Sequence, residues 1–302
     1  PYWGLRDYKS IEQIGLEQHP SEYIDKIVAF MKEAKRVIKP TGTIFLNLGD
    51  SFYTKSGSGQ GSNFLKRHEI LDGNEGNLSK AHSELRGKFK SNWLQSKQKL
   101  LIPYRIAIKC QDELGLILRN DLHWIKQFVN VKTKESYGSS VPSSVKDRFS
   151  TNSESIFFFV KSKKYYFNLD SIRFPHKISS IKRYNYPNNQ KNETPYSKQL
   201  DIHSKNSFNH LGKNPGDCLH FPFEPRKVKH FAMFPTLLPY FFIKCACPKN
   251  GIVLDPFIGS GTTASACIIA KRNFMGFDSN SIYCKFARET IEFANKNYGK
   301  EK

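Results

Sequence analysis

The chain has 302 residues, enough for one large domain or two modest ones with a buried core. Hydrophobic residues make up 38% of it, and Pro235, Pro239 and Lys244 interrupt the best apolar stretch, which excludes the roughly 20 apolar residues of a membrane span. The 47 Lys and Arg against 27 Asp and Glu leave a net charge of +20, which indicates a polyanionic partner or, alternatively, a lysine-rich proteome.

The cysteines do not form a recognisable framework. Cys245 and Cys247 are separated by one residue, which is not the spacing of a zinc knuckle or a thioredoxin-type pair. We therefore expect reduced thiols, a cytoplasmic location and no metal. The chain starts at Pro1 without a basic and then apolar leader, so no signal peptide is expected.

Hydrophobic periodicity organises the first half of the chain. It predicts a helix over residues 21–38 and a buried strand over residues 43–48. Residues 51–99 are polar, basic and without periodicity, which is typical of a functional loop. The next predicted elements are a helix over residues 103–114 and strands over residues 116–125, 155–160 and 165–167.

The second half changes character twice. Residues 173–226 are basic, rich in Asn, Ser and Tyr, and show little periodicity. Strands then alternate with helices, which predicts an α/β sheet. The elements expected here are helices over residues 236–245, 262–270 and 281–297, and strands over residues 251–254 and 273–277.

The segment after residue 254 has the residues of a nucleoside site. Gly259 and Gly261 permit a sharp turn and a close approach of a ligand, and the next helix presents free N–H groups to an anionic group. Asp278 ends the neighbouring predicted strand, where it can accept hydrogen bonds from ribose hydroxyls. A plain tight turn is the alternative for the glycines alone, but together with Asp278 they favour a nucleoside cofactor.

Five motifs in one order resemble the amino-methyltransferases of bacterial restriction–modification systems. In the matching arrangement of that family, the catalytic motif precedes the target-recognition region and the cofactor loop comes last. Pro1-Tyr2, followed by Trp-Gly-Leu-Arg-Asp-Tyr, is similar to the end of the family's (Ser/Asp)-Pro-Pro-Tyr tetrapeptide and the residues after it. The other matching segments are Asn47 to Ser51; Trp124 to Lys126 with Asp147-Arg148 and Ser153-Glu154; Asn214 to Asp217 with His230 to Pro235; and Asp255 to Thr263.

The resemblance implies a Rossmann-like S-adenosylmethionine-dependent α/β fold, with helices on both faces of the sheet and an inserted target-recognition region. Residues 1–172 would form the catalytic half, residues 173–226 the insertion and residues 227–302 the cofactor half. The implied reaction is methyl transfer to the exocyclic amino group of a flipped base, with cytosine N4 favoured over adenine N6. An RNA or small-molecule methyltransferase and an inactive DNA-binding specificity component remain open alternatives.

The resemblance also implies roles for individual residues. Tyr2 would stack on the flipped base, while the backbone at Pro1 would accept a hydrogen bond from its amino group. The candidates for the target-base pocket are Trp124, Lys126, Asp147 and Arg148. Asp147 and Arg148 could equally form a structural ion pair. The candidates for cofactor binding are Asp255, Pro256, Phe257, Gly259, Gly261, Thr262 and Asp278, with Phe234 and Phe277 as either adenine contacts or core residues.

Position between the family motifs makes residues 173–226 the expected recognition region, although the composition alone fits a solvated insertion better. Basic residues would contact phosphates and asparagines would read base edges. The expected DNA contacts are Lys177, Lys182, Arg183, Asn188, Asn189 and Lys191. Double-stranded DNA and a cognate restriction endonuclease are the expected partners, and residues 51–99 are expected to clamp DNA.

The family also places a strand, an acidic cofactor contact and the start of the tetrapeptide before the residue that corresponds to Pro1. We therefore expect either a longer native protein or an incomplete gene product, and weak or no methyl transfer from a chain that truly starts at Pro1. Serine at the first tetrapeptide position would suggest cytosine N4 and aspartate adenine N6. The segment from Tyr2 to Tyr8 is more similar to the serine type.

Overall fold

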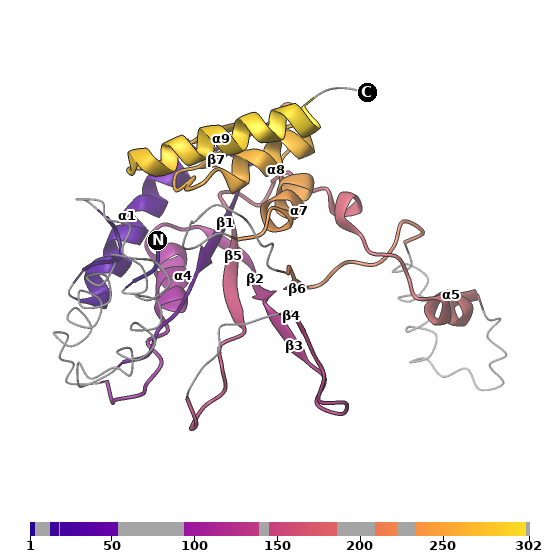
Figure 1. Cartoon of the computed structure of the whole chain (residues 1–302), viewed down its shortest axis with the longest axis horizontal. Coiled ribbons are helices and arrows are strands. Elements are labelled where there is room, and N and C mark those ends of the chain that lie inside the picture. The colour runs from indigo at the N-terminus through magenta and orange to yellow at the C-terminus, as the bar shows by residue number, and fades with distance from the viewer. Residues whose placement is uncertain are drawn as a thin grey trace.

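The computed structural model describes residues 1–3, 13–17, 19–53, 94–138, 145–185, 209–222 and 234–299. A four-stranded sheet in the order β1-β5-β2-β6 lies at its centre, and two parallel strands form a separate pair (Figure 1). The central strands are β1 (Thr43–Leu48), β2 (Ile117–Ile125), β5 (Ser153–Val160) and β6 (Cys218–His220), and the separate pair is β7 (Ile252–Asp255) and β8 (Asn273–Gly276). The helices are α1 (Pro20–Val37), α4 (Ile102–Asp112), α5 (Ile178–Asn185), α7 (Leu237–Ala246), α8 (Thr262–Ala270) and α9 (Ser281–Tyr298), with a 3-10 helix at Leu169–Ile172.

Helices cover both faces of the central sheet, as the sequence predicted. Strand β5 is antiparallel to both β1 and β2, and its side chains alternate between two apolar clusters. Phe157 and Phe159 are fully buried against α1 and α4, while Phe158 and Val160 pack with Phe242 of α7 on the other face. Because β6 is parallel to β2, the sheet is mixed.

The β7-β8 pair carries the C-terminal helices. Helix α8 lies between α7 and α9 and is buried along nearly its whole length (Figure 1). Within the described residues no strand joins β7 to β1, the end strand of the central sheet. Apolar side chains of the pair are correspondingly exposed, by 66% for Ile252 and 52% for Met275.

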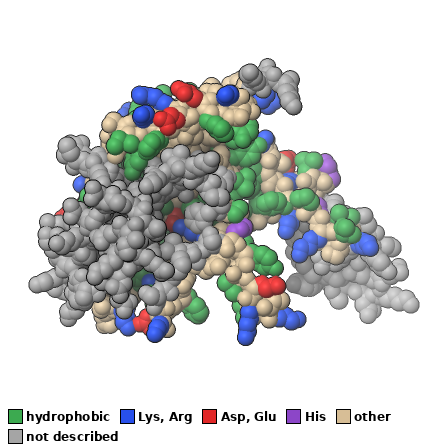
Figure 2. Space-filling model, viewed as in Figure 1, with side chains coloured by type: hydrophobic (Ala, Val, Ile, Leu, Met, Phe, Trp, Pro, Cys, Tyr) green, Lys and Arg blue, Asp and Glu red, His purple; other side chains and the backbone are tan. Residues whose placement is uncertain are grey.

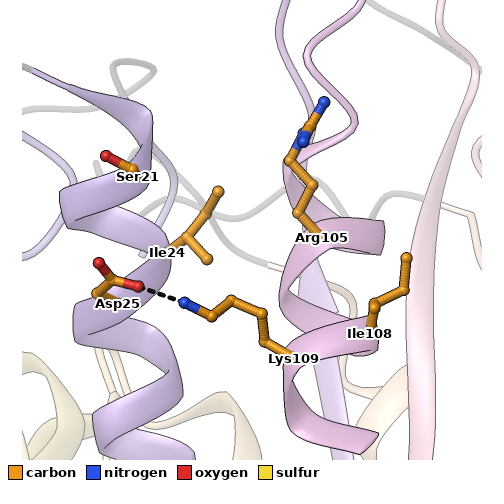
Figure 3. Close-up of a pocket in the computed structure, with 6 residues that line it drawn as sticks. All are labelled: Ser21, Ile24, Asp25, Arg105, Ile108 and Lys109. Carbon is orange, nitrogen blue, oxygen red and sulfur yellow. Dashed lines mark hydrogen bonds and ion pairs between the residues drawn. The ribbon is translucent and has the colours of Figure 1, made fainter. Parts of the chain in front are cut away.

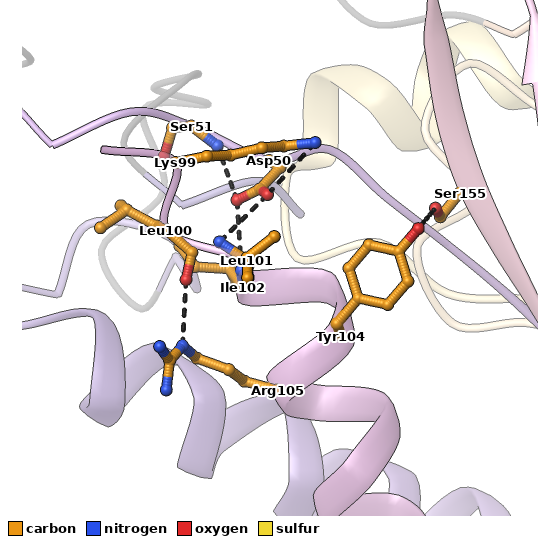
Figure 4. Close-up of polar contacts among 9 residues, drawn as sticks. All are labelled: Asp50, Ser51, Lys99, Leu100, Leu101, Ile102, Tyr104, Arg105 and Ser155. Carbon is orange, nitrogen blue, oxygen red and sulfur yellow. Dashed lines mark hydrogen bonds and ion pairs between the residues drawn. The ribbon is translucent and has the colours of Figure 1, made fainter. Parts of the chain in front are cut away.

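The carboxylate of Asp50 caps the start of α4 from a distant part of the chain. One oxygen accepts hydrogen bonds from the backbone N–H groups of Ser51 (2.9 Å) and Ile102 (3.1 Å), and the other accepts from Leu101 (3.1 Å) (Figure 4). The first N–H groups of a helix have no partner within it, so this carboxylate supplies one. Burial raises the pKa of Asp50, and the N–H donors oppose that rise.

We expect an Asp50→Ala substitution to lower the free energy of unfolding by about 0.5–2 kcal/mol, because it leaves the partly buried N–H groups of Ser51 and Ile102 without their acceptor. Asp50→Asn keeps one acceptor oxygen and should cost less. Urea denaturation of the two variants measures the difference. Equal losses, or no loss for the alanine variant, would argue against the capping role.

The predicted elements agree with the structure to within one or two residues, with one exception. Residues 165–167 do not form a strand. The N–H of Tyr166 donates instead to the carbonyl of Thr41 at 2.9 Å, and the rings of Tyr165 and Phe167 pack on Phe158. The sequence did not predict α5, β6 or the hairpin of β3 (Gln127–Val129) and β4 (Ser136–Gly138).

Two expected absences concern the described part of the chain. No helix there is long and apolar enough to cross a membrane. The same residues contain no group of three or more His, Cys, Asp or Glu side chains that could hold a metal ion. Most of the predicted clamp at residues 51–99 lies outside the described residues, which include only 51–53 and 94–99 of it.

Candidate active site

A chain of polar contacts connects Tyr2 to the central sheet. The Tyr2 hydroxyl donates to Glu154 Oε2 at 2.9 Å, and Glu154 Oε1 forms an ion pair with Lys126. The Lys126 ammonium lies 4.8 Å from the centre of the Trp124 ring. Trp124 and Glu154 are directly opposite each other in the β2-β5 register. Two neighbouring strands therefore fix the orientation of the Tyr2 hydroxyl.

Helix α1 and the residues before it hold the segment around Tyr2. The Tyr23 hydroxyl donates to the carbonyl of Pro1 at 2.7 Å, and the indole N–H of Trp3 donates to the carbonyl of Glu17 at 3.0 Å. Gly15 has a φ of +115°, and a Cβ there would lie 2.4 Å from the carbonyl oxygen of Tyr2. Only glycine fits at this position, so the backbone of Tyr2 is enclosed as well as its hydroxyl.

The four candidates for the target-base pocket divide into two groups. Trp124 and Lys126 join Tyr2, although Trp124 is only 3% exposed and donates its indole N–H to the Phe221 carbonyl at 2.9 Å. Its ring therefore belongs to the core and acts on the site through Lys126. Glu154 received no separate role from the sequence; the register of β2 against β5 is the signal that identifies it.

Asp147 and Arg148 lie in a different set of contacts. Asp147 pairs with Lys97 at 2.5 Å, and the Arg148 guanidinium lies 3.9 Å from the centre of the Phe52 ring. The hydrogen bond from Lys97 lowers the pKa of Asp147. The expected alternative, an ion pair between Asp147 and Arg148, is not what the structure contains.

The carboxylate of Asp255 closes the turn between β7 and α8. One oxygen accepts the N–H of Phe257 at 3.0 Å, and the other accepts the hydroxyl of Thr263 at 2.5 Å. Burial raises the pKa of Asp255, and the Thr263 hydroxyl opposes the rise. Thr263 was not among the predicted cofactor residues, although its position just inside the helix is the signal that would include it.

Asp278 stabilises the same turn from the end of β8. Its carboxylate accepts the N–H of Gly259 at 3.0 Å and the N–H of Asn280 at 2.9 Å. Each carboxylate oxygen has a second lone pair, so these bonds leave acceptor capacity for a ribose hydroxyl. The predicted strand-end acid is thus next to the glycine turn, as a nucleoside site requires.

The two glycines of the turn have different reasons to be glycine. Gly259 has a φ of +52° and lies at the contact with Asp278. Gly261 has a φ of +87°, and a Cβ there would lie 2.9 Å from Cα and 3.0 Å from the carbonyl oxygen of Ala287 in α9. The contact with α9 therefore requires glycine at position 261, whatever the ligand of the turn.

The remaining cofactor candidates differ in exposure. The Phe257 ring lies 4.9 Å from the Phe30 ring of α1, and Thr262 is buried at the start of α8. Pro256 is half-buried in the same turn. Phe277 is 56% exposed at the end of β8, whereas Phe234 packs against the apolar cluster that contains Phe158 and Phe242. Of the two aromatic candidates, Phe277 is the one beside the glycine turn, because its carbonyl accepts the N–H of Ile258 at 2.9 Å.

The predicted DNA contacts are only partly described. Helix α5 projects away from the sheet (Figure 1) and contains Lys182, which is exposed, and Arg183, of which only the backbone is described. Lys177 immediately precedes this helix. Asn188, Asn189 and Lys191 lie outside the described residues.

A shallow hollow of about 290 Å³ lies between α1 and α4 (Figure 3). An ion pair between Asp25 and Lys109 at 2.6 Å crosses it. It contains none of the residues predicted for catalysis, cofactor binding or DNA contact. We therefore assign no substrate to this hollow.

Comparisons with known proteins show the family and the fold of the chain. A family model described as DNA methylase matches residues 1–289. The chain is 30% identical to the type II methyltransferase M.SmaI of Serratia marcescens, over 96% of this chain and 81% of that protein. It is 26% identical to M.SfiI of Streptomyces fimbriatus, over 94% and 82%. The solved structure of PvuII DNA methyltransferase (cytosine-N4-specific) has the same fold, with a TM-score of 0.57 at 16% identity over 99% of this chain and 82% of that chain.

Proposed function

The chain belongs to the DNA methylase family of N6 and N4 amino-methyltransferases, and from this membership we propose that Tyr2 and the glycine turn form one active site. The enzyme transfers a methyl group from S-adenosylmethionine to the exocyclic amino group of a base in double-stranded DNA. The base is flipped out of the duplex, because a stacked base cannot present its amino group to the methyl donor.

Helix α1 provides the observation that carries this proposal. Its Tyr23 binds the carbonyl of Pro1, and its Phe30 packs on Phe257 of the cofactor turn at 4.9 Å between ring centres. Residues seven apart lie on one face of a helix and are separated by about 10 Å along the axis. The Tyr2 segment and the glycine turn therefore contact the same face of α1. This separation suits a base and a methyl donor that must meet between them.

The chain's own residues fit the cofactor. Asp278, two residues after β8, has acceptor capacity for ribose hydroxyls. The turn containing Gly259 leads into the N-terminus of α8, and Phe277 offers an exposed ring. Bound S-adenosylmethionine supplies a methyl group on a positively charged sulfur. The other cofactor candidates, Asp255 above all, are proposed to stabilise the backbone conformation of the turn.

The residues around Tyr2 position the base. The tyrosine ring offers a stacking surface, and its hydroxyl is held by Glu154, which the Lys126 ammonium neutralises. The carbonyl of Pro1 already accepts a bond from Tyr23 and has a second lone pair for the amino group of the base. Such an acceptor orients the nitrogen lone pair toward the methyl donor, and transfer is direct, without a covalent enzyme intermediate.

For the finer points, we propose cytosine N4 rather than adenine N6, because the segment from Tyr2 to Tyr8 is more similar to the cytosine type. We also propose a cognate restriction endonuclease and a location in the bacterial cytoplasm. The region of residues 173–226 would read the target sequence.

Sequencing that detects modified bases in single molecules tests the reaction directly. Genomic DNA from cells expressing the gene in its natural reading frame should contain N4-methylcytosine at one short motif, and DNA from cells with the Tyr2→Ala gene should not. A tritiated-methyl assay that compares DNA with tRNA then tests which nucleic acid is the substrate. Labelled tRNA with unlabelled DNA would overturn the proposal, and N6-methyladenine would correct the base.

We expect Asp278→Ala to weaken S-adenosylmethionine binding by about 10- to 100-fold, because a charged acceptor of ribose hydroxyls is removed. Isothermal titration calorimetry measures the change. Asp170→Ala is the matched control. Asp170 forms an ion pair with Arg173 at 2.5 Å and is not part of the turn. Because Asp278 also binds Gly259, the melting temperature without cofactor should be recorded. Unchanged affinity in a folded variant would contradict the assignment.

A further inference from the structure

Two segments project from the same end of the central sheet, away from α8 and α9 (Figure 1). One is the β3-β4 hairpin, and the other is the segment at residues 145–152 that leads into β5. Each carries a strongly exposed apolar side chain: Val131 is 88% exposed and Phe149 is 96% exposed. Lys and Arg side chains lie at this end of the molecule, next to Asp and Glu side chains (Figure 2). The proposed reaction as described above uses neither projection.

The residues next to Phe149 are firmly attached. Asp147 pairs with Lys97 at 2.5 Å, and the Arg148 guanidinium stacks on the Phe52 ring at 3.9 Å. Arg148 also donates to the carbonyl of Phe149 at 3.1 Å. The backbone is thus held on a platform while the phenyl ring itself stays in solvent. An exposed ring on a fixed support is typical of a contact surface.

The ring is close to the proposed site. Phe149 precedes Glu154, the partner of the Tyr2 hydroxyl, by five residues, and five extended residues span at most about 17 Å. The carbonyl of Asn152 between them accepts the N–H of Lys126 at 2.8 Å, which fixes the segment against β2. On a duplex with a rise of about 3.4 Å per base pair, this reach is about five base pairs.

The charge around the ring favours a nucleic acid. Lys132, Lys134, Lys146 and Arg148 belong to the two projections. The two acidic residues of the same segments are already engaged, Asp147 by Lys97 and Glu135 by the hydroxyl of Thr133 at 3.0 Å. An apolar ring at a positively charged end of the molecule is complementary to the stacked bases and phosphates of a nucleic acid.

We propose that Phe149 inserts into the base stack of duplex DNA beside the flipped base and fills the space that the base leaves. The inference rests on the proposed function, since base flipping creates that space. The platform of Lys97, Asp147, Phe52 and Arg148 holds the ring in position, and the lysines of the hairpin bind the neighbouring phosphates.

Both tests use the protein expressed from the gene in its natural reading frame. The first test measures tritiated-methyl transfer to sheared, unmethylated phage DNA, which contains short target motifs of every kind. Phe149→Ala should reduce the initial rate by about tenfold or more, and Phe149→Trp should retain most of it because another aromatic ring can stack. Phe293→Ala, at a 65% exposed ring in α9 on the opposite end of the molecule, should leave the rate unchanged. Phe149 is too exposed for its truncation to disturb the core.

The second test does not depend on turnover. The full chain with p-benzoylphenylalanine at position 149, or at position 293 as control, is irradiated with short radiolabelled duplexes of random sequence. Cross-linking at 149 above the control, together with the rate loss, supports insertion. If the unchanged protein methylates DNA but no cross-link forms at position 149, the inference is overturned and the proposed function stands. A cross-link without a loss of rate has the same meaning. If the unchanged chain transfers no methyl group, the function fails, and insertion beside a flipped base fails with it.

Discussion

Replacement of Tyr2 by alanine is expected to slow methyl transfer by about 10- to 100-fold while the affinity for S-adenosylmethionine stays within about twofold. The loss follows from removing the ring on which the flipped base stacks, a contact of about 1–3 kcal/mol. The residues proposed to bind the cofactor are at the end of the chain, from Asp255 to Asp278, and keep their contacts with one another. Single-turnover kinetics and calorimetry on the same preparation measure the two quantities.

Tyr2→Phe separates the ring from its hydroxyl. This variant keeps the stacking surface but removes the hydrogen bond to Glu154 Oε2, so we expect a loss of only about two- to tenfold. Asp278→Ala provides the opposite profile, with weakened cofactor binding. If Tyr2→Ala and Asp278→Ala reduced turnover and cofactor affinity alike, the division of the site into a base half and a cofactor half would be wrong.

Replacement of Gly261 by alanine is expected to lower the free energy of unfolding by about 2–5 kcal/mol. Two costs add: the backbone has a φ of +87°, and the new Cβ would meet the Cα and carbonyl oxygen of Ala287 at 2.9 and 3.0 Å. Because these neighbours are backbone atoms, no side-chain rotation relieves the contact. Helix α9 would have to move away from α8.

Gly216→Ala is the matched control for this substitution. Gly216 has nearly the same backbone angle, with a φ of +83°, but a Cβ there would meet nothing within 4 Å. It should cost only the backbone strain, about 1–2 kcal/mol. Chemical denaturation of both variants isolates the cost of the contact with Ala287 as the difference. Equal losses would show that this contact contributes nothing to stability.

The long elements were predictable from the sequence because each buries one continuous apolar pattern. Helix α1 has apolar residues at helical spacing, and strands β1 and β5 contain short apolar runs. The three-residue strands β3 and β4 have no room for such a pattern. Residues 165–167 were mistaken for a strand because a run of aromatic residues is typical of strands. Here the rings of Tyr165 and Phe167 pack on Phe158 without strand pairing.

The sequence predicted which residues belong to the proposed site better than it predicted their interaction partners. The sequence identified Asp255 and Asp278 as polar ends of strands, but only the structure gives their N–H donors at the turn. Asp147 and Arg148 are adjacent in the sequence and yet have separate partners, Lys97 and Phe52. Neither partner could be inferred without knowing how residues 51–53 and 94–100 pair.

The position of α1 has a consequence for the order and strength of binding. One rigid helix contacts the Pro1 carbonyl through Tyr23 and the cofactor turn through Phe30. In the proposed site, a displacement of α1 by one ligand would change the free energy of binding of the other. Thermodynamic reciprocity then requires that S-adenosylmethionine alters the affinity for DNA by the same factor by which DNA alters the affinity for S-adenosylmethionine.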